Sequence, residues 1–456
     1  MVAVENGWNL RCEIWYRILL MSPIGVICAM IYVDFFSEAL VVYMFFAQFL
    51  CTFISFVFRD RGRSTLKRAI SSDGIHIILT SQYKEERWLL ERLIDSVRAN
   101  KPTWPVYFVV AAERGSNLVL ENWNIPEKYS DLNIHIAVHE KGIPGERPGL
   151  GSNLHNAINY INKNLPIDAS KVILTKLDGN CIVSNTLLNQ IESSWRVGDE
   201  NVVFQLQLEE LDSKTEEFTR IPFLLKYGFT GVYPRYVPYA NMTSSGNLGL
   251  ASSFCLPLQL VNTYGNWDPW LIQEDNLTWY RAVVGARGFP RFKFIHSRVY
   301  NAPAVSFYDQ FKQFERSVGG SIIARAVLYS NSRTWCSLRI FYILNSLLLS
   351  TTISWAPIYN VAFIIQQVLG TIIDWRIWIT LLVIQSATIS ISGLQHIEAL
   401  APKSLTESIG FFIMFIILQP PITLGMTCFR FYIYIRGWLT YESQASYHTT
   451  GTVTKQ

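Results

Sequence analysis

Charged residues are scarce in this chain of 456 residues and make up 16% of it, whereas an average soluble domain has about 25%. Half of the residues are hydrophobic, which indicates contact with lipid wherever apolar residues form long runs. The net charge is only +4, and a nucleic-acid binder would instead gather basic residues on one face. We therefore expect a membrane protein that has no nucleic-acid partner.

Cysteine and histidine are also scarce, with seven residues of each type. No two cysteines form a C-x-x-C pair, and the histidines are dispersed along the chain. The sequence therefore predicts neither a disulfide framework nor a zinc site.

Long apolar runs are missing from the middle of the chain and occur only towards its two ends. The runs Tyr16–Val33 and Ala39–Phe58 each approach the roughly 20 residues that a helix needs to cross hydrocarbon. The basic segment Arg59–Arg68 follows at once and places that side of the membrane in the cytosol by the positive-inside rule. We expect two spans here and three or four later, because the second of the later runs can instead lie along the interface. The later runs are Arg339–Trp355, Pro357–Ile373, Ile377–Leu394 and Ile409–Ile435.

These runs divide the chain into four parts. We expect a transmembrane hairpin with a basic juxtamembrane segment at 1–70, a cytosolic α/β domain at 71–333, a transmembrane bundle at 334–440 and a cytosolic tail at 441–456. A transporter is disfavoured, because the spans hold few of the ionisable residues that transport sites use. The chemistry is therefore expected in the domain at 71–333.

The central domain alternates short β-branched runs with helical periodicity. Lys84–Arg98 has apolar residues at helical spacing, and Asn153–Lys163 is also typical of a helix. Strands that alternate with helices predict a parallel, doubly wound sheet, whose ligands bind beyond the carboxyl ends of the strands. The predicted strands are Gly74–Thr80, Val106–Ala112, Ile134–Val138, Lys171–Leu177 and Val202–Leu208.

Polar residues follow three of these strands and are the first candidates for a site. Asp178 and Asn180 flank a flexible glycine after a buried strand, and two such oxygen ligands can hold Mg²⁺ or Mn²⁺ against a diphosphate. A triplet of this kind is by itself more often an ordinary turn, and its position at a strand end favours the metal site. The other residues at strand ends are Gln82, Glu85, Glu86, Glu113 and Arg114.

Two adjacent carboxylates, Glu274 and Asp275, precede a helix-like stretch at Asn276–Val283. Acidic residues at the start of a helix commonly complement the helix dipole. The alternative is a general base, in which one carboxylate takes the proton from an attacking hydroxyl. The residues alone leave both interpretations open.

Five segments share their order with the motifs of a known family: Thr80–Glu86, Gly149–Ala157, Asp178–Asn180, Gln273–Asp275 and Gln313–Ser317. They resemble, in turn, the P-x-Y-N-E-like turn, the G-K-x-x-A-L-N-x-A segment, the D-x-D, the T/Q-E-D and the Q-x-x-R-W of family 2 inverting glycosyltransferases. That superfamily includes the chitin, cellulose and hyaluronan synthases, and its soluble domain has the GT-A fold. Each segment is a weak signal, but five in the same order are specific.

The resemblance implies a membrane-integrated enzyme that transfers a sugar from a nucleotide-sugar donor, a UDP-sugar, to a hydroxyl of a glycan or lipid acceptor. Such an enzyme would build or modify a surface polysaccharide. Asp275 would act as general base, Glu274 would shape the pocket, and Asp178 with Asn180 would hold a divalent cation, Mg²⁺ or Mn²⁺. The residues implied in donor binding are Gln82, Glu86, Glu113, Asn153, Asp178, Gln313 and Arg316.

Four positions depart from the family pattern. Glu113 stands where many members have an Asp that contacts the nucleobase, and Leu150 replaces a lysine. Asn180 replaces the second Asp of the metal motif, and Ser317 replaces the Trp that lines the acceptor site in polymerising members. The missing Trp counts against a processive synthase.

The departures leave two alternatives beside the transferase. One is a degenerate, non-catalytic membrane protein that binds a nucleotide sugar or a partner. The other is a lipid-linked-sugar synthase that acts on a polyprenyl phosphate. In each case we expect an integral, multi-pass protein of the plasma membrane or of the Golgi or ER, with its α/β domain in the cytosol.

Overall fold

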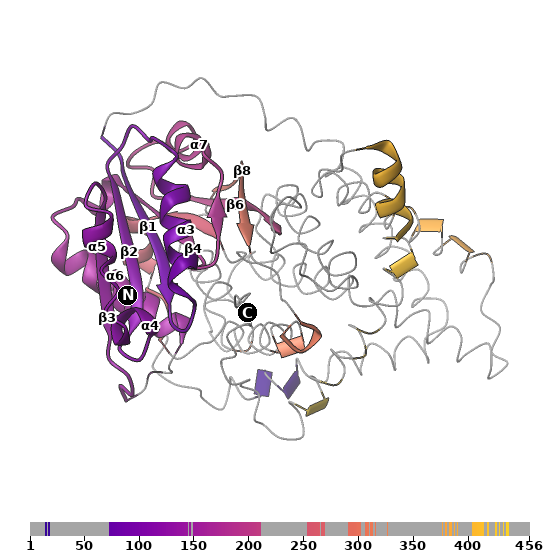
Figure 1. Ribbon diagram of the computed structural model, residues 1–456, viewed down its shortest axis with the longest axis horizontal. Coiled ribbons are helices and arrows are strands. Elements are labelled where there is room, and N and C mark those ends of the chain that lie inside the picture. The colour runs from indigo at the N-terminus through magenta and orange to yellow at the C-terminus, as the bar shows by residue number, and fades with distance from the viewer. Residues whose placement is uncertain are drawn as a thin grey trace.

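The computed structural model describes residues 73–210 except 145, 147 and 148, residues 253–269 except 265, and residues 291–301. It also describes scattered positions at 14–18 and between 306 and 436, of which 404–414 is the longest continuous run. The first three stretches build one α/β domain, whose larger part is coloured from indigo to magenta in Figure 1.

Eight strands of the described chain form one mixed sheet in the order β3-β2-β1-β4-β7-β6-β8-β5. β1 pairs in parallel with β2 and β4, β2 pairs in parallel with β3, and β6 pairs in parallel with β8. β7 runs antiparallel to its neighbours β4 and β6, and β5 runs antiparallel to β8. The strands are β1 Ile75–Gln82, β2 Val106–Glu113, β3 Asn133–His139, β4 Val172–Leu177, β5 Ile182–Val183, β6 Val202–Glu210, β7 Phe254–Pro257 and β8 Arg291–Asn301.

Helices lie between these strands in the chain. α3 and α6 are long enough to cover several strands, and the others are short. The helices are α3 Arg87–Arg98, α4 Asn117–Leu120, α5 Ile125–Lys128, α6 Leu150–Asn164, the 3-10 turn η2 Ala169–Lys171, α7 Leu187–Ser194 and α10 Leu258–Tyr264.

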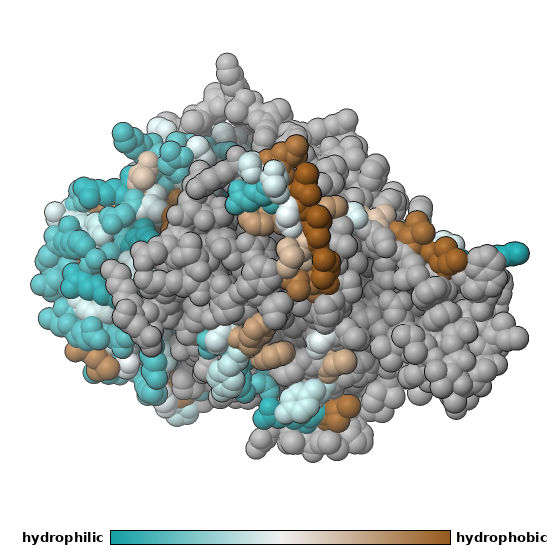
Figure 2. Space-filling model, turned by 45° about the vertical axis from the view of Figure 1, so that its right-hand side comes forward, coloured by the Kyte–Doolittle hydropathy of each residue, from teal (hydrophilic) through white to brown (hydrophobic). Residues whose placement is uncertain are grey.

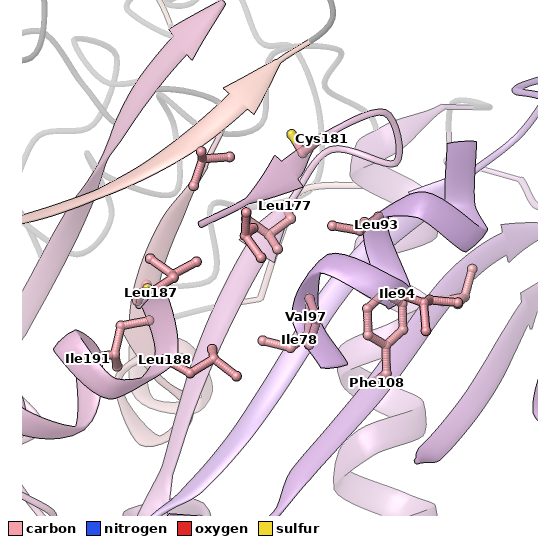
Figure 3. Packing of buried hydrophobic residues seen from close by; sticks show 14 of the residues in the cluster. Ile78, Leu93, Ile94, Val97, Phe108, Leu177, Cys181, Leu187, Leu188 and Ile191 are labelled. Carbon is pink, nitrogen blue, oxygen red and sulfur yellow. The ribbon is translucent and has the colours of Figure 1, made fainter. Parts of the chain in front are cut away.

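One face of the sheet is covered by α3 and α7. Leu93 and Ile94 of α3 pack in one cluster with Ile78 of β1 and Phe108 of β2, and Leu188 of α7 joins the same cluster (Figure 3). Each of these side chains is almost completely buried, and full burial of a side chain of this size contributes about 1.5–3 kcal/mol. The cluster therefore holds α3 and α7 on the sheet.

The opposite face is covered by α6. This helix contacts β1, β2 and β3, and its buried Leu154 and Ile158 lie outside the cluster under α3. Side chains alternate along a strand, so Ile77 and Leu79 of β1 point to the α6 side. Helices on both faces confirm the doubly wound arrangement that the sequence predicts for the first half of the sheet.

The five predicted strands and the two predicted helices are confirmed, with shifts of a few residues at their ends. α3 begins at Arg87 rather than at Lys84, because the chain first makes a turn in which Gln82 Nε2 donates to the carbonyl of Glu85 at 2.9 Å. The predicted parallel pairing is confirmed for β1, β2, β3 and β4, but the sheet as a whole is mixed, because β7 is inserted antiparallel between β4 and β6. β7 is short and buried at all four positions, so it carries no alternating pattern that would reveal it.

A buried polar cluster lies at the amino ends of the central strands. His76 Nε2 is 3.3 Å from Glu192 Oε1, which also accepts the backbone N–H groups of Thr103 at 2.8 Å and Trp104 at 2.9 Å. The ring of Trp104 lies 5.1 Å from that of His76 and meets Trp195 edge-on. Burial lowers the pKa of His76. Burial alone would raise the pKa of Glu192, but the hydrogen bonds from His76 and from the Trp104 backbone hold it below its ordinary value.

The predicted membrane spans and the domain boundaries lie almost entirely outside the described residues and stay predictions. Within the part of the chain that the structure describes, no helix is both long and apolar enough to cross a membrane. On the helical run 404–414, Leu405, Ile409 and Ile413 recur every four residues and are exposed. Figure 2 shows exposed hydrophobic residues in brown, away from the hydrophilic teal surface of the α/β domain.

Candidate active site

The predicted site residues Gln82, Glu113 and Asp178 lie at the carboxyl ends of three neighbouring strands. Gln82 is the last residue of β1, Glu113 is the last residue of β2, and Asp178 directly follows β4. From β1 the chain continues to β2 and β3 on one side and returns through α6 to β4 on the other. Open α/β sheets place their ligands at such a reversal of strand order. The fold therefore brings these residues to one edge, next to the switch between β1 and β4.

The turn Asp178–Asn180 lies directly against the end of β1. A Cβ atom added at Gly179 would lie 2.6 Å from the backbone oxygen of Ser81 and 3.2 Å from Gln82 Oε1. The backbone N–H of Cys181 closes the turn by donating to the Asp178 carbonyl at 3.1 Å. Glycine is thus needed for the close approach of two backbones, whereas the sequence had suggested flexibility. The triplet is a turn, and it is also placed at the ligand edge.

Three buried side chains near this edge carry oxygen atoms without a hydrogen-bond partner among the described residues. They are Thr80 Oγ1, Gln82 Oε1 and Asn153 Oδ1, and their residues are at most 3% exposed. The Thr80 and Gln82 oxygens are also the side-chain atoms that lie nearest to Gly179. Leaving a buried polar group unpaired costs about 1–3 kcal/mol. Such atoms at a strand edge therefore favour a polar ligand.

Two adjacent glutamates after β1 have different surroundings. The side chain of Glu86 accepts a hydrogen bond from Trp88 Nε1, which ties it to the first turn of α3. Glu85 Oε2 accepts the backbone N–H of Tyr83 at 2.7 Å. Burial raises the pKa of Glu85, and the nearby carboxylate of Asp178 raises it further. Glu85, which was not among the predicted donor contacts, is therefore the glutamate coupled to Asp178, and the role of Glu86 stays a prediction.

Glu113 lies in a second group of charged residues at the ends of β2 and β3. It is 3% exposed and pairs in register with His139, whose Nε2 is 2.7 Å from Glu146 Oε2. Lys141 Nζ lies 3.7 Å from Glu113 Oε1, a separation at which the charges attract without a hydrogen bond. A buried carboxylate that has an ion pair but no hydrogen bond on this oxygen is suited to accept a hydrogen bond from a ligand.

The chain that leads to the predicted general base is anchored on α6. His155 Nδ1 donates to the Trp267 carbonyl at 2.7 Å, and Asn266 Nδ2 donates to the His155 carbonyl at 2.9 Å. The Trp267 ring stacks on Phe254 of β7, with their centroids 6.2 Å apart. Asp268 follows and is buried. These contacts fix the chain shortly before the predicted motif. The predicted residues Glu274, Asp275, Gln313 and Arg316 themselves lie outside the described residues.

Lys176 is a residue of this edge that the sequence reasoning did not select. Its Nζ donates to Asp178 Oδ1 at 2.9 Å, and its side chain is 1% exposed while that of Asp178 is 31% exposed. Residues two positions apart on an extended chain point to the same face, which explains the pairing. The signal that would have found it is a single charged residue in a predicted buried strand, two residues before the aspartate.

The Lys176 ion pair bears on the predicted metal site. One oxygen of Asp178 already accepts from an ammonium group, and the second predicted ligand, Asn180, offers only a neutral amide oxygen. A divalent cation at this carboxylate would meet a like charge that has no exposure to screening solvent. Among the described residues, no group of three or more His, Cys, Asp or Glu is placed to hold a metal ion. As the structure places them, Asp178 and Asn180 do not fit the predicted cation.

Comparison with known proteins adds distant structural likenesses. No protein-family model matches the chain, and no curated protein matches it. Among solved structures, the chain is similar to the mannosyltransferase PcManGT from Pyrobaculum calidifontis in complex with GDP-Man and Mn²⁺. The identity is 13% and the TM-score is 0.40, over 77% of this chain and 97% of the other.

The chain is also similar to S. aureus TarS. For TarS 1–349 in complex with UDP-GlcNAc, the identity is 13% and the TM-score is 0.40, over 76% of this chain and 90% of the other. For the longer TarS structure, the identity is 14% and the TM-score is 0.34, over 74% of this chain and 54% of the other. With TM-scores this low, the likenesses do not decide the function, which rests on the residues of the site.

Proposed function

We propose that this chain is a glycosyltransferase that binds a nucleotide-sugar donor, a UDP-sugar, at the carboxyl ends of β1, β2 and β4. The sugar goes to a hydroxyl of a glycan or lipid acceptor with inversion at the anomeric carbon. The order of five sequence segments supports this assignment, as does their resemblance to family 2 glycosyltransferases.

One observation carries the proposal. The turn Asp178–Asn180 lies against the end of β1 at the switch in strand order, with the unpaired oxygens of Thr80 and Gln82 beside it. Buried acceptor atoms can receive N–H and O–H groups of a nucleoside, and Glu113 offers a carboxylate at the next strand end. The place of these atoms at the carboxyl ends of the strands, where open α/β sheets bind ligands, favours a ligand as their partner.

The reaction we propose uses Asp275 as general base. The acceptor hydroxyl oxygen attacks the anomeric carbon of the donor, and the Asp275 carboxylate takes the proton of that hydroxyl. The bond between the anomeric carbon and the diphosphate oxygen breaks, and the nucleoside diphosphate leaves with the bonding electron pair. The contacts of Asn266 and Trp267 with α6 support a fixed position for the start of this segment. Gln313 and Arg316 are proposed to contact the diphosphate.

The predicted divalent cation, Mg²⁺ or Mn²⁺, is not part of this reaction scheme. It stays a prediction from Asp178 and Asn180, and the ion pair between Asp178 and Lys176 speaks against it. Donor binding with and without added metal ion decides the point.

The test is turnover of the purified full-length chain with a panel of UDP-sugars, measured as release of UDP. Asp275→Asn should lower turnover by about 10²–10⁴-fold, because an amide of the same shape cannot accept the proton. Donor affinity should be nearly unchanged, since the base acts in the transition state. Asp131→Asn is the matched control, because Asp131 is 47% exposed and forms a surface ion pair with Arg98.

Two outcomes would change the assignment. Full activity of Asp275→Asn would move the base to another residue. Donor binding by the wild type without any release of UDP, with or without glycan and polyprenyl-phosphate acceptors, would favour the non-catalytic binder. The departures at Leu150 and Asn180 motivate that second candidate. To test for a lipid-linked-sugar synthase, the chain is incubated with a radiolabelled sugar donor and polyprenyl phosphate. Radiolabel recovered in the lipid extract would identify this activity.

We also propose that the chain is an integral membrane protein whose α/β domain is cytosolic. The exposed turn at Lys141 and Gly142 offers a place for an epitope tag, because nothing lies within 4 Å of an added Cβ at Gly142. The tag should be protected from protease in sealed vesicles of native orientation and cleaved in inverted ones. The opposite pattern would reverse the topology.

A further inference from the structure

Lys176 holds a buried positive charge at the site edge. It is the fifth residue of β4, a strand whose six residues are all buried. In the sheet it lies next to Leu79 of β1 and Phe254 of β7. Its Nζ reaches Asp178 Oδ1 at 2.9 Å, beyond the end of the strand. The ammonium group thus lies beside the carboxylate that directly follows β4, at the edge where ligands bind.

Burial of this ammonium group has a cost. Taking a lysine out of water is unfavourable, and the ion pair with Asp178, which is itself 31% exposed, offsets part of that loss. An apolar side chain of similar length would fill the same space without the cost. A charge kept at such a position is typical of a functional site.

The position of the charge matches the chemistry of the proposed reaction. The leaving group of a nucleotide-sugar donor is a diphosphate, on which negative charge grows as the bond to the sugar breaks. Asp178 sits between the ends of β4 and β1, because its following residue Gly179 contacts Ser81. The Lys176 ammonium is bound to this same aspartate. A preorganised cation at the point where charge develops stabilises the transition state.

We infer that Lys176 is a tethered cation that binds the donor's diphosphate in place of a divalent metal ion, with Asp178 holding the ammonium group in position. This inference rests on the proposed function and names the group that neutralises the leaving diphosphate. It also gives Asp178 a different task from the predicted one, since the carboxylate orients a lysine rather than ligating a metal. The same pair accounts for an amide at Asn180, because no second anionic metal ligand is then required.

The experiment compares nucleotides that differ by one phosphate. Binding of UDP and UMP, and of GDP and GMP, to the full-length chain is measured by calorimetry, once in EDTA and once with Mn²⁺. Lys176→Met removes the charge and keeps an apolar stem of similar length. Lys171→Met is the matched control, because Lys171 precedes the amino end of the same strand and is exposed.

In EDTA, the wild type and Lys171→Met should bind the diphosphate about 10- to 100-fold more tightly than the monophosphate, as expected for one charge-assisted hydrogen bond. Lys176→Met should lose this preference. With the ammonium gone, Asp178 becomes free to take a metal ion, so Lys176→Met with UDP should bind Mn²⁺, seen by electron paramagnetic resonance. The wild type should not, and the double variant Lys176→Met/Asp178→Asn should lose the gained Mn²⁺ signal.

Several results would overturn the inference. If the wild type binds nucleoside diphosphates with Mn²⁺ but not in EDTA, a metal ion is required. This comparison uses the wild type alone, so it does not depend on the folding of a variant. A preference for UDP over UMP that survives in Lys176→Met would show that the lysine does not bind the diphosphate. In both cases the proposed function stands. If the wild type binds no nucleoside diphosphate in either condition, the proposed function fails together with the inference.

Discussion

The central strands carry a polar pair at each end, and the two pairs differ in their surroundings. At the amino ends, Glu192 is enclosed, and its Oε1 accepts from His76 and from two backbone N–H groups. At the carboxyl ends, Asp178 has one hydrogen bond from Lys176 on Oδ1 and is partly exposed. The first pair has aromatic rings against it. The second has unpaired oxygens of Thr80 and Gln82 near it.

This difference separates a structural role from a binding role. The Glu192 carboxylate of α7, enclosed with three donors, holds this helix to the elements that supply the donors, which are β1 and the chain before β2. A carboxylate at an exposed strand end, next to unpaired acceptor atoms, leaves capacity for a ligand. Both ends also keep buried polar atoms without a partner among the described residues, and at the amino ends these are His76 Nδ1 and Glu192 Oε2. Burial of charge therefore does not identify a site by itself. The partial exposure of Asp178 and its place at the carboxyl ends of the strands distinguish the binding end.

The largest effect is expected from Glu192→Ala. The substitution should lower the free energy of unfolding by about 3–5 kcal/mol, because His76 and two backbone N–H groups lose their acceptor while they stay buried. Hydrogen exchange of the β1 and β2 amides in the full-length chain measures this loss. Glu200→Ala is the control, since Glu200 is exposed. The folded fraction should keep its UDP affinity. A loss no larger than that of Glu200→Ala would contradict the structural role.

Gly179→Ala should have the next largest effect. The added Cβ would lie 2.6 Å from the Ser81 carbonyl oxygen, and overpacking of this kind costs about 1–3 kcal/mol. UDP binding should weaken as well, because the Asp178 turn moves away from β1. Gly115→Ala is the matched control for stability, since its Cβ would meet only Glu113 Oε1, at 3.9 Å. Equal stability of the two variants would show that the turn has room for a Cβ atom at position 179.

The pH dependence of stability tests the structural role of His76 and Glu192 at the amino ends of the central strands. Because the folded-state pKa of His76 lies below its ordinary value of 6.5, the unfolded chain binds the extra proton. The free energy of unfolding should therefore fall as the pH decreases below 6.5, with a slope of at most about 1.4 kcal/mol per pH unit for one proton. His76→Gln does not titrate and should give a shallower slope between about pH 6.5 and 5. The lowered pKa of Glu192 acts in the same direction, but only below its ordinary value of 4.5. An unchanged slope in His76→Gln would mean that another group is responsible.

The smallest effect is expected from Thr80→Val and has the opposite sign. Thr80 Oγ1 is buried without a partner among the described residues, so its removal should raise the free energy of unfolding by about 1 kcal/mol and weaken UDP binding. Thr175→Val is the matched control on the neighbouring strand, because Thr175 Oγ1 donates to Cys255 Sγ at 3.3 Å. Hydrogen exchange and calorimetry on both variants measure the two effects. Destabilisation by Thr80→Val would show that the hydroxyl has a structural partner.

Much of the fold was predictable because it follows from local patterns. The apolar spacing in α3 identified Leu89, Leu90, Leu93, Ile94 and Val97, and all five are buried. The β-branched runs identified five strands, and the polar residues after them identified Gln82, Glu113 and Asp178 at one edge. These features depend on the order of residues within one element, which the sequence displays directly.

Other features were decided only by the tertiary structure. The antiparallel place of β7, the pairing of His76 with Glu192 across 116 positions, and the contact of Gly179 with Ser81 all join segments that are distant in the chain. Lys176 lies near Asp178 in the sequence, but its burial depends on the neighbouring strands β1 and β7. Hydrophobic spacing determines which residues form an element and which face is buried. It does not determine which elements become neighbours, because that depends on how all the buried faces pack together.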